Sequence, residues 1–390
     1  MTYFHGIHVS EPVTGVRPIL EKSLAIIGIL ATATAAVGAP TVALDEAFPL
    51  NRPVLITDVR SAIGVAGTGG TLKDALEQIA NQGSPLVVVV RVEPGVDEAE
   101  MNANLIGGTA DGIYSGMQAF LAAEQVLGVR PRIFGAPGFD TQEVVAALVI
   151  VAKRLRGFVY AAADGALTVA AAILYRQEFS DRELMLIWPD ATGWEGKAIA
   201  AAMGLRAVID EREGWHKSLS NVAIAGFTGL TRDVHFDIRD SSSDAGVLNE
   251  DQVTTIVRLT GYRFWGNRTC SDEPLFAFET ATRSAQAIQD AIADGLAWAI
   301  DKPMTVGLVR DIIETINATL RRWKNEGRII GGEAWFDAAL NPAEQLAAGK
   351  LVIDYDFTPV SPLEGLQLNQ RITGKYYQGF GDALLGATPN

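Results

Sequence analysis

Cysteine and histidine are scarce in this sequence. Cys270 is the one cysteine in 390 residues, and there are four histidines. A single cysteine excludes an internal disulfide and argues against a cysteine-based metal cluster. Of the histidines, only His5 and His8 lie close together, and Gly6 between them favours an extended arm over a chelating helical turn. We therefore expect no metal site and no cofactor.

Basic residues are also fewer than acidic ones. The chain has 32 Lys and Arg residues against 46 Asp and Glu, a formal net charge of -14 and a pI near 4.8. This balance argues against a nucleic-acid partner, because phosphate neutralisation needs a basic face. Leu24 to Leu44 lacks charge but is rich in Thr, Gly and Ala and contains Pro40, which fits neither a membrane span nor a signal peptide. We expect a soluble protein with no membrane partner.

The first half of the chain alternates short apolar runs with segments of helical pattern. Continuous apolar strands separated by helices predict an α/β domain with a mostly parallel sheet covered on both faces. The predicted strands are Leu24–Leu30, Pro53–Ile56, Leu86–Val92, Arg132–Ala136, Gly157–Ala161 and Leu184–Trp188, and the predicted helices include Thr71–Asn81, Gly116–Gln125 and Thr141–Leu155.

The next stretch is predicted to close this domain. Trp194 to Leu205 is alanine-rich and predicts a tightly packed helix, after which Arg206 to Glu213 leads into a turn at Gly214. Thr228 to Ile238 is expected to be a strand region. The polar stretch Asp240 to Asp244 predicts a linker, and hence a domain boundary near residue 248.

Beyond residue 248 the pattern predicts a compact α+β domain. It begins with a helix over Glu250–Leu259 and a hairpin that joins Tyr262–Trp265 to Phe276–Phe278. Amphipathic spacing then predicts two helices. The later elements are the helices Arg283–Trp298 and Thr305–Glu326 and the strands Glu333–Asp337, Lys350–Phe357 and Leu366–Ile372.

The two ends of the chain are predicted to be arms. The first residues mix Gly and Pro with isolated apolar residues, which favours an extended segment. Leu366–Ile372 alternates as a strand does, with no partner obvious in the local sequence. The predicted organisation is an N-terminal arm over 1–22, an outer α/β domain over 23–248, an α+β C-terminal domain over 249–359 and a C-terminal arm over 360–390.

Catalytic and nucleotide-binding patterns are weak. Gly64 to Gly70 lacks the spacing of a dinucleotide loop, and Gly193 to Ala198 has Ala where a phosphate loop needs Ser or Thr. A Ser218, His216 and Asp210 set has no turn that presents the serine. The sequence does not point to an enzyme.

Two glycine-bounded motifs stand out instead, Gly214–Asn221 and Gly261–Thr269. Each sets aromatic and polar anchors in a turn, which suits holding a fixed surface. Arg268 is expected to pair with an acid, either within the chain or on a neighbour. The anchor positions are Gly214, Trp215, Lys217, Asn221, Gly261, Trp265, Gly266, Asn267, Arg268 and Thr269.

These motifs resemble the sheath protein of contractile tails, in the short two-domain kind found on myophages and R-type tailocins. The resemblance covers the ordered series in Asp210–Asn221 and Thr255–Thr269, the start at Tyr3–Ile7 and the first strand at Ser23–Gly28. It implies a structural subunit that polymerises as hexameric rings into a helical sheath around the tail tube protein. Contraction then drives the tube through the target cell envelope.

The resemblance also implies roles for particular segments. The arms are expected to exchange strands with neighbouring subunits. The C-terminal domain is expected to face the tube, and the two motifs to brace the two domains. The baseplate and tail terminator are further expected partners, and the subunit would assemble in the bacterial host cytoplasm into a virion tail or tailocin particle. The residues concerned are Tyr3, Phe4, Ile7, Val9, Leu366, Leu368 and Ile372 in the arms and Arg321, Arg322, Lys324 and Arg328 as a basic tube contact.

Two alternatives stay open at the level of sequence. One is an α/β enzyme with an appended interaction domain, which would need a convergent polar pocket at the carboxyl edge of the sheet. The other is a sheath component of a related secretion or injection system. Long ribbed cylinders by electron microscopy would be expected only of a sheath.

Overall fold

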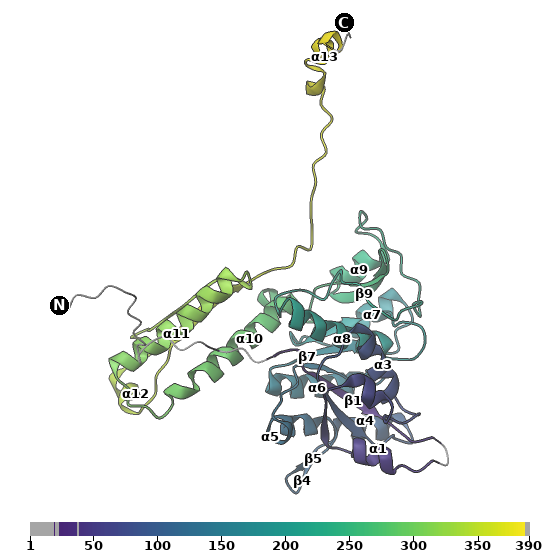
Figure 1. The fold of residues 1–390 in the computed structure, drawn as a ribbon, viewed down its shortest axis with the longest axis vertical. Helices are drawn as coiled ribbons and strands as arrows, with labels where there is room; N and C mark the ends of the chain where they lie inside the picture. Colours follow the sequence, from purple (N-terminus) through teal and green to yellow (C-terminus); the bar gives the residue numbers. More distant parts are fainter. Residues whose placement is uncertain (1–18, 20–22, 37–38, 387–390) are drawn as a thin grey trace, which may run out of the picture.

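The computed structural model describes residue 19, residues 23–36 and residues 39–386. Its larger part is an α/β layer structure, and a smaller group of helices and strands lies beside it (Figure 1). From the smaller group an extended segment projects away and ends in a short helix. The Tyr3, Phe4, Ile7 and Val9 positions of the N-terminal arm lie outside the described residues.

An eight-stranded sheet forms the centre of the α/β part. Its strand order is β10-β9-β8-β7-β6-β1-β3-β2, and the pairs from β9 to β3 are parallel while each edge strand is antiparallel. The mostly parallel sheet predicted from the sequence is confirmed. The strands are β1 Ile27–Thr32, β2 Pro53–Ile56, β3 Val87–Val92, β6 Ile133–Gly135, β7 Phe158–Ala162, β8 Leu184–Ile187, β9 Val253–Arg258 and β10 Tyr262–Trp265.

Helices cover both faces of this sheet. One face packs on α3 (Leu72–Gln82) and α8 (Lys197–Arg212), and the other packs on α4 (Glu98–Ile106) and α6 (Gln142–Leu155). Strands buried on both faces are continuously apolar, as in the all-buried run of β3. The shorter elements of this part are α1 Val42–Ala47, α2 Val59–Ile63, β4 Thr109–Ala110, β5 Ile113–Tyr114, η1 Gly116–Ala122, α5 Ala123–Leu127, α7 Val169–Arg176, α9 Asp244–Glu250 and η2 Pro274–Phe276.

The alanine-rich helix α8 is buried along nearly its whole length, from Ala198 to Ile209. Small side chains let it approach α3 closely: a Cβ added to Gly204 would lie 3.0 Å from the Cα of Ile79. The predicted helix over Trp194–Leu205 therefore exists, but it starts at Lys197. It also runs through Arg206 to Arg212, where the sequence pattern predicted a lead into a turn.

Three local predictions were wrong. Glu250–Leu259 is not a helix: α9 ends at Glu250, and β9 then joins the parallel sheet beside β8. The β-branched run from Val253 to Val257 favours a strand once that edge is available. Thr228–Ile238 has only a single bridge, between Leu230 and Ala191. The partner of β10 is β9 and not Phe276–Phe278.

The sheet consequently continues past residue 248, where the sequence pattern placed the domain boundary. Strands β9 and β10 belong to the large sheet, and the chain enters the smaller part through α10 (Glu279–Leu296). The smaller part consists of α10, η3 Ala297–Ala299, α11 Val306–Asn325, β11 Ile329–Trp335, α12 Ala343–Ala347 and β12 Asp354–Pro359.

A second apolar core lies in this smaller part. Ile288 and Ile292 of α10 pack with Ile316, Leu320 and other apolar residues of α11 against the β11–β12 pair. Both predicted amphipathic helices are confirmed. Ile19 and Leu24, which precede β1, also belong to this core, so the start of the chain crosses from the smaller part to the sheet.

The C-terminal segment leaves the body after residue 364 as an extended chain. It ends in η4 Lys375–Tyr377 and α13 Phe380–Gly386. Leu366, Leu368 and Ile372 are 71%, 80% and 100% exposed and pair with no strand in the described part of the chain. No helix in the described ranges is long and apolar enough to span a bilayer.

Candidate functional site

The two glycine-bounded motifs meet in space. The hydroxyl of Ser218 donates to the side-chain oxygen of Asn267, and the main-chain N–H of Gly266 donates to the Ser220 hydroxyl at 3.1 Å. The N–H of Asn221 donates to the carbonyl of Phe264 at 2.8 Å. Motifs that lie about forty residues apart in the sequence thus form one unit along the edge strand β10.

The backbone of this unit depends on unusual torsion angles. Asn221 has a φ of 60°, and its carbonyl accepts a 2.6 Å hydrogen bond from the Arg263 guanidinium. Gly266 has a φ of 149°, and an added Cβ would lie 2.6 Å from Thr254 Oγ1. Glycine is needed there because any side chain would collide with β9. Gly214 and Gly261 also have positive φ values, 108° and 104°.

Trp215 connects the first motif to the second core. Its ring is 4% exposed and meets Trp323 of α11 edge to face, with centroids 6.2 Å apart. It follows directly after the end of α8, a helix of the sheet layer. The neighbouring carbonyl of Lys217 accepts a 2.6 Å hydrogen bond from Arg206 of α8. The predicted bracing of the two parts by this motif therefore has a physical basis.

A first charge network lies beneath the motifs. Arg206 and Asp210 of α8 and Glu279 and Arg283 of α10 are all at most 2% exposed at their side chains. Arg206 bonds Asp210 at 2.9 Å and Glu279 at 3.4 Å, while Arg283 bonds the other Asp210 oxygen. The Tyr160 hydroxyl of β7 donates to Glu279. Two guanidinium groups face two carboxylates, so the buried cluster is neutral.

Burial alone would lower the pKa of Arg206, but the carboxylates of Asp210 and Glu279 outweigh it and the pKa is raised. Burial also raises the pKa of Tyr160 well above its usual value, so the phenol keeps its proton and serves as a donor. Arg206 therefore stays charged and paired with Asp210 and Glu279 across ordinary pH. It ties α10 to the centre of the sheet.

A second charge network fixes the same helix further along. The Asp290 carboxylate of α10 forms ion pairs with both Arg132 and Arg156 of the sheet part. The side-chain amide of Gln286, also on α10, donates to the Gly157 carbonyl at 2.8 Å. Burial lowers the pKa of Arg132 to about 10, and the Asp290 carboxylate opposes that shift. Gln286 and Asp290 thus bind α10 to the sheet part, while Ile288 and Ile292 of the same helix lie in the second core.

The second motif bonds the first residue of α10 and the loop before that helix. The carbonyl of Asn267 accepts the Glu279 N–H at 2.9 Å, and the Thr269 hydroxyl donates to the Phe276 carbonyl at 2.7 Å. Trp265 packs against Phe236 with centroids 5.1 Å apart. Arg268 forms a two-pronged ion pair with Glu364, at 3.1 and 2.6 Å, so in this structure its acidic partner lies within the chain.

A cleft of about 380 Å³ lies between the two motifs and the start of the C-terminal segment. Residues of the two motifs line it, among them Ser218, Asn221 and Asn267, together with residues 360–364. The sequence indicated the motifs but not this meeting place, because residues 360–364 follow β12, in the smaller part of the structure.

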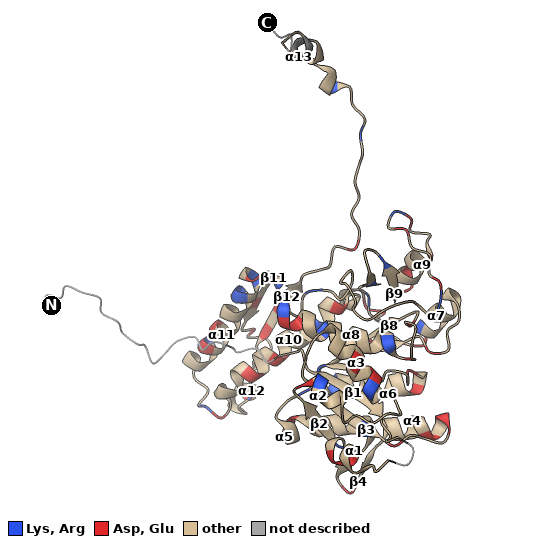
Figure 2. Ribbon diagram, turned by 45° about the vertical axis from the view of Figure 1, so that its right-hand side comes forward, with Lys and Arg blue, Asp and Glu red and all other residues tan. Residues whose placement is uncertain are grey.

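The predicted basic cluster lies where α11 ends beside β11 (Figure 2). Arg321 is exposed and pairs with Glu314, and Arg328 bonds Glu326 at 2.9 Å. Arg322 donates to the carbonyl of Ile19 at 3.1 Å. Lys324 is exposed. Nearby acids therefore offset part of the positive charge.

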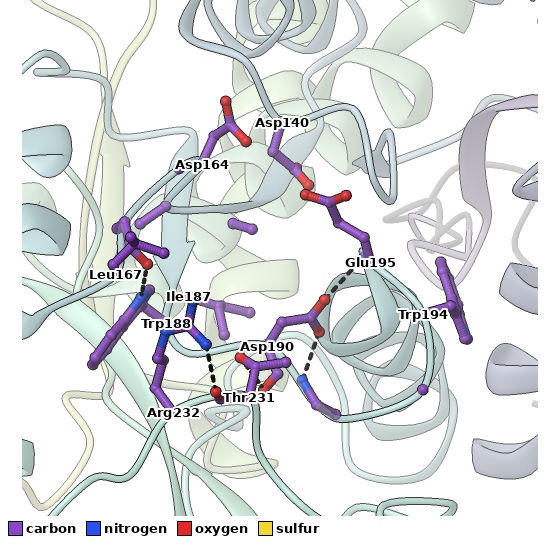
Figure 3. A pocket seen from close by; sticks show the side chains of 17 residues that line it. Asp140, Asp164, Leu167, Ile187, Trp188, Asp190, Trp194, Glu195, Thr231 and Arg232 are labelled. Carbon is purple, nitrogen blue, oxygen red and sulfur yellow. Dashed lines mark hydrogen bonds between the residues drawn. The ribbon is translucent and has the colours of Figure 1, made fainter.

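An acidic cleft of about 410 Å³ opens at the carboxyl ends of β7 and β8 (Figure 3). Asp140, Asp164, Asp190 and Glu195 line it. No sequence motif marks this cleft, because its acids come from three separate loops: Asp140 follows β6, Asp164 follows β7, and Asp190 and Glu195 both follow β8. The position of these acids just after predicted strands could have indicated the cleft, since side chains that follow parallel strands converge at one edge of the sheet.

This edge is not arranged for a phosphate. The Asp190 carboxylate accepts the N–H groups of Gly196 and Ala198 at 2.7 Å each, so it occupies the N-terminal end of α8. That end is where a helix binds an anion, and the remaining carboxylates repel one. Burial raises the pKa of Asp140 well above its usual value. In the described residues no group of three or more His, Cys, Asp or Glu could hold a metal ion.

Comparison with known proteins assigns the chain to a family. Profiles for three phage sheath domains match in order: the tail sheath protein Gp18 domain III N-terminal region over residues 25–92, the phage tail sheath protein central domain over 112–270 and the phage tail sheath C-terminal domain over 271–373. The chain belongs to the phage tail sheath protein family. The sheath protein is a subunit of a contractile tail and a component of the tail particle.

Relatives of the sheath protein match over nearly its whole length. It is 50% identical to the tail sheath protein of Escherichia phage P2, over 96% of both chains. It is 44% identical to the major tail sheath protein of Serratia phage KSP20, over 99% of both. The family is structural, which removes the support for the enzyme alternative.

Solved structures share its fold. The anti-feeding prophage helical sheath in its contracted state has a TM-score of 0.68 at 14% identity, covering 96% of this chain and 100% of that one. The sheath complex of the extracellular contractile injection system PVC, also contracted, has a TM-score of 0.67 at 14% identity, covering 96% and 99%. Injection-system sheaths therefore share the architecture.

Proposed function

We propose that the sheath protein polymerises as stacked hexameric rings around an inner tail tube, and that contraction of this lattice drives the tube through a target cell envelope. The observation that carries the proposal is the C-terminal segment. Leu366, Leu368 and Ile372 alternate as a strand does, yet all three are exposed and unpaired in the described structure. Such a segment is suited to pair with another subunit.

The acceptor that we propose is the two-stranded β11–β12 sheet of a neighbouring subunit. In the described ranges these strands pair only with each other. The side-chain amide of Asn317 bonds the N–H and the carbonyl of Ala334 at 2.7 and 3.0 Å, which occupies part of the β11 edge. The outer edge of β12 then offers the better place for an added strand. The N-terminal arm, with Tyr3, Phe4, Ile7 and Val9, is the second proposed donor.

Exchange of these arms would keep neighbours connected while the rigid bodies slide past each other. The extended sheath would be metastable, so stored conformational energy takes the place of ATP. We further propose that the smaller domain faces the tube and that the sheet domain faces outward. The baseplate and the tail terminator would bind the two ends of the lattice, and assembly would take place in the host cytoplasm.

Deletion tests the role of the arms. Subunits without residues 1–12 or 365–390 should remain folded, with the circular dichroism spectrum of the full chain, but should form no ribbed cylinders in negative-stain electron microscopy. Cylinders of normal length and diameter from both deletions would refute strand exchange. A full-length subunit purified in parallel is the control for assembly conditions.

The tube contact rests on the basic cluster Arg321, Arg322, Lys324 and Arg328. Arg321 and Lys324 are exposed, so their charge can be reversed without disturbing the Arg322 bond to Ile19. Exposed charges at the rim of an interface set register and association rate. Arg321→Glu with Lys324→Glu should reduce sheath formation on tubes while leaving empty sheath cylinders. Normal assembly on tubes would disprove the contact.

A further inference from the structure

Arg268 of the second motif contacts the chain at the point where the C-terminal arm leaves the body. We name residues 360–364 the arm root. The Arg268 Nε and Nη2 atoms lie 3.1 and 2.6 Å from the two carboxylate oxygens of Glu364. Within the described chain, every residue from 365 to 381 is exposed. Pro362 is the last half-buried residue before this segment, and Glu364 is exposed but held by Arg268.

The guanidinium is held in place from several sides. The backbone of Arg268 bridges that of Phe278, and the guanidinium carbon lies 5.4 Å from the centre of the Phe278 ring. On either side, the Asn267 carbonyl accepts the N–H of Glu279 and the Thr269 hydroxyl donates to the Phe276 carbonyl. A planar guanidinium fixed in this way presents two donors in one direction, which matches a carboxylate. The Glu364 carboxylate in turn raises the pKa of Arg268, so this group stays charged.

The two partners belong to different parts of the molecule. The arm root follows β12 of the smaller domain, and near its start the Val360 carbonyl accepts the Thr280 hydroxyl at 3.5 Å. Arg268 follows β10 of the large sheet. The chain therefore emerges from one domain but is held by a residue of the other.

We infer that Arg268 is a positioning residue for assembly: its ion pair with Glu364 fixes the starting point and direction of the C-terminal arm relative to the sheet domain. This inference rests on the proposed strand exchange. Without a fixed root the arm samples many directions, and its strand then meets the neighbouring acceptor less often. A fixed root reduces that entropic cost before a neighbour arrives.

The pair is also weak enough to yield during contraction. Both side chains are 35% exposed, and exposed ion pairs contribute little to folding stability because water screens them. Breaking the pair should therefore leave the fold intact and change only the direction of the arm. This separation of effects makes the inference testable.

The test uses the full-length chain with Arg268→Gln, Glu364→Gln and the exchanged pair Arg268→Glu with Glu364→Arg. Arg239→Gln is the matched control, because Arg239 is 85% exposed and pairs with Asp237. Spin labels are placed at Leu368→Cys and Leu174→Cys, both at exposed positions, and buried Cys270 should stay unlabelled. Electron–electron distance distributions report the direction of the arm in dilute subunits, and light scattering reports the threshold concentration for assembly.

We expect both Gln variants to broaden the distance distribution and to raise the assembly threshold by about three- to tenfold, with a melting temperature within about 2 °C of the unaltered chain. The exchanged pair should restore a narrow distribution and a low threshold. Distributions and thresholds equal to those of Arg239→Gln would overturn the inference, as would a loss of assembly that follows a loss of melting temperature. If the 365–390 deletion also assembles normally, the proposed strand exchange itself fails; if the deletion abolishes assembly, the failure is confined to Arg268.

Discussion

The first charge network and the Arg268–Glu364 pair use the same chemical groups in opposite surroundings. Around Asp210 the side chains are at most 2% exposed, whereas Arg268 and Glu364 are 35% exposed. A buried charge that loses its partner carries the full cost of its desolvation, while an exposed one is solvated again. Arg–carboxylate contacts therefore bind α10 permanently to the sheet domain but hold the arm root only weakly.

This contrast fits a subunit that moves without deforming. A lattice that contracts by sliding needs bodies that stay rigid and links that can reorient. The two charge networks and Trp215 connect both cores into one body, and the exposed segment beyond Glu364 remains outside it.

Asp210→Ala should have the largest effect. It leaves Arg206 and Arg283 buried with one carboxylate between them, so we expect a loss of about 3–5 kcal/mol in the free energy of unfolding. Urea unfolding monitored by tryptophan fluorescence measures it. Glu314→Ala, which removes the exposed partner of Arg321, is the control and should change stability by less than about 1 kcal/mol. Equal losses of stability in the two variants would contradict the proposed difference between the buried cluster and the exposed pair.

Trp215→Ala should come next, with a loss of about 3 kcal/mol, because it removes a buried aromatic ring from the second core and leaves a cavity beside Trp323. The smaller domain should then exchange its amide hydrogens faster than the sheet domain does. Hydrogen exchange by mass spectrometry resolves the two. Trp335→Ala, at a ring that is 41% exposed, is the matched control. An equal increase in the rate of amide hydrogen exchange in both domains would argue against a bracing role.

Asp140→Asn should stabilise the subunit by up to about 1 kcal/mol at neutral pH. The folded-state pKa of Asp140 is raised, so its contribution to stability is present below the ordinary pKa and is lost as pH rises through the folded value. The gain from Asn should therefore grow as pH rises above about 4. Thermal unfolding from pH 4 to 8 measures it against Asp311→Asn, an exposed control. A gain that is independent of pH would exclude this cause.

Deletion of residues 365–390 should have the smallest effect on the folded subunit, below about 0.5 kcal/mol, because the segment buries little surface on its own chain. Leu368 and Ile372 are 80% and 100% exposed. The same urea titration that detects the Asp210 effect measures it. A loss of several kcal/mol would show that the segment contributes to the subunit's own core.

Much of the sheet domain was predictable from local pattern. Runs such as Val87–Val92 are apolar throughout because both faces of the sheet are covered, so the signal does not depend on distant residues. The amphipathic spacing of α10 and α11 was equally local. The helix predicted over Glu250–Leu259 failed because β8 offers an open edge, and the β-branched run in that segment pairs with it.

The candidate site was only half predictable. Gly266 and Asn221 signalled turns, since their backbone conformations restrict the residue type, and the motif order pointed to the family. Nothing in the local pattern showed that Ser218 meets Asn267, or that Arg268 meets Glu364 ninety-six residues later.

The sequence by itself determined most of the helices and strands, the absence of metal-binding and phosphate-loop motifs, and membership of the sheath family, because periodicity, turn residues and ordered motifs are local properties of the chain. The tertiary structure alone decided which charges are buried and which are exposed. Asp210 and Glu364 are both carboxylates paired with arginine, and only the packing of α8 on α10 removes water from the first while leaving it at the second.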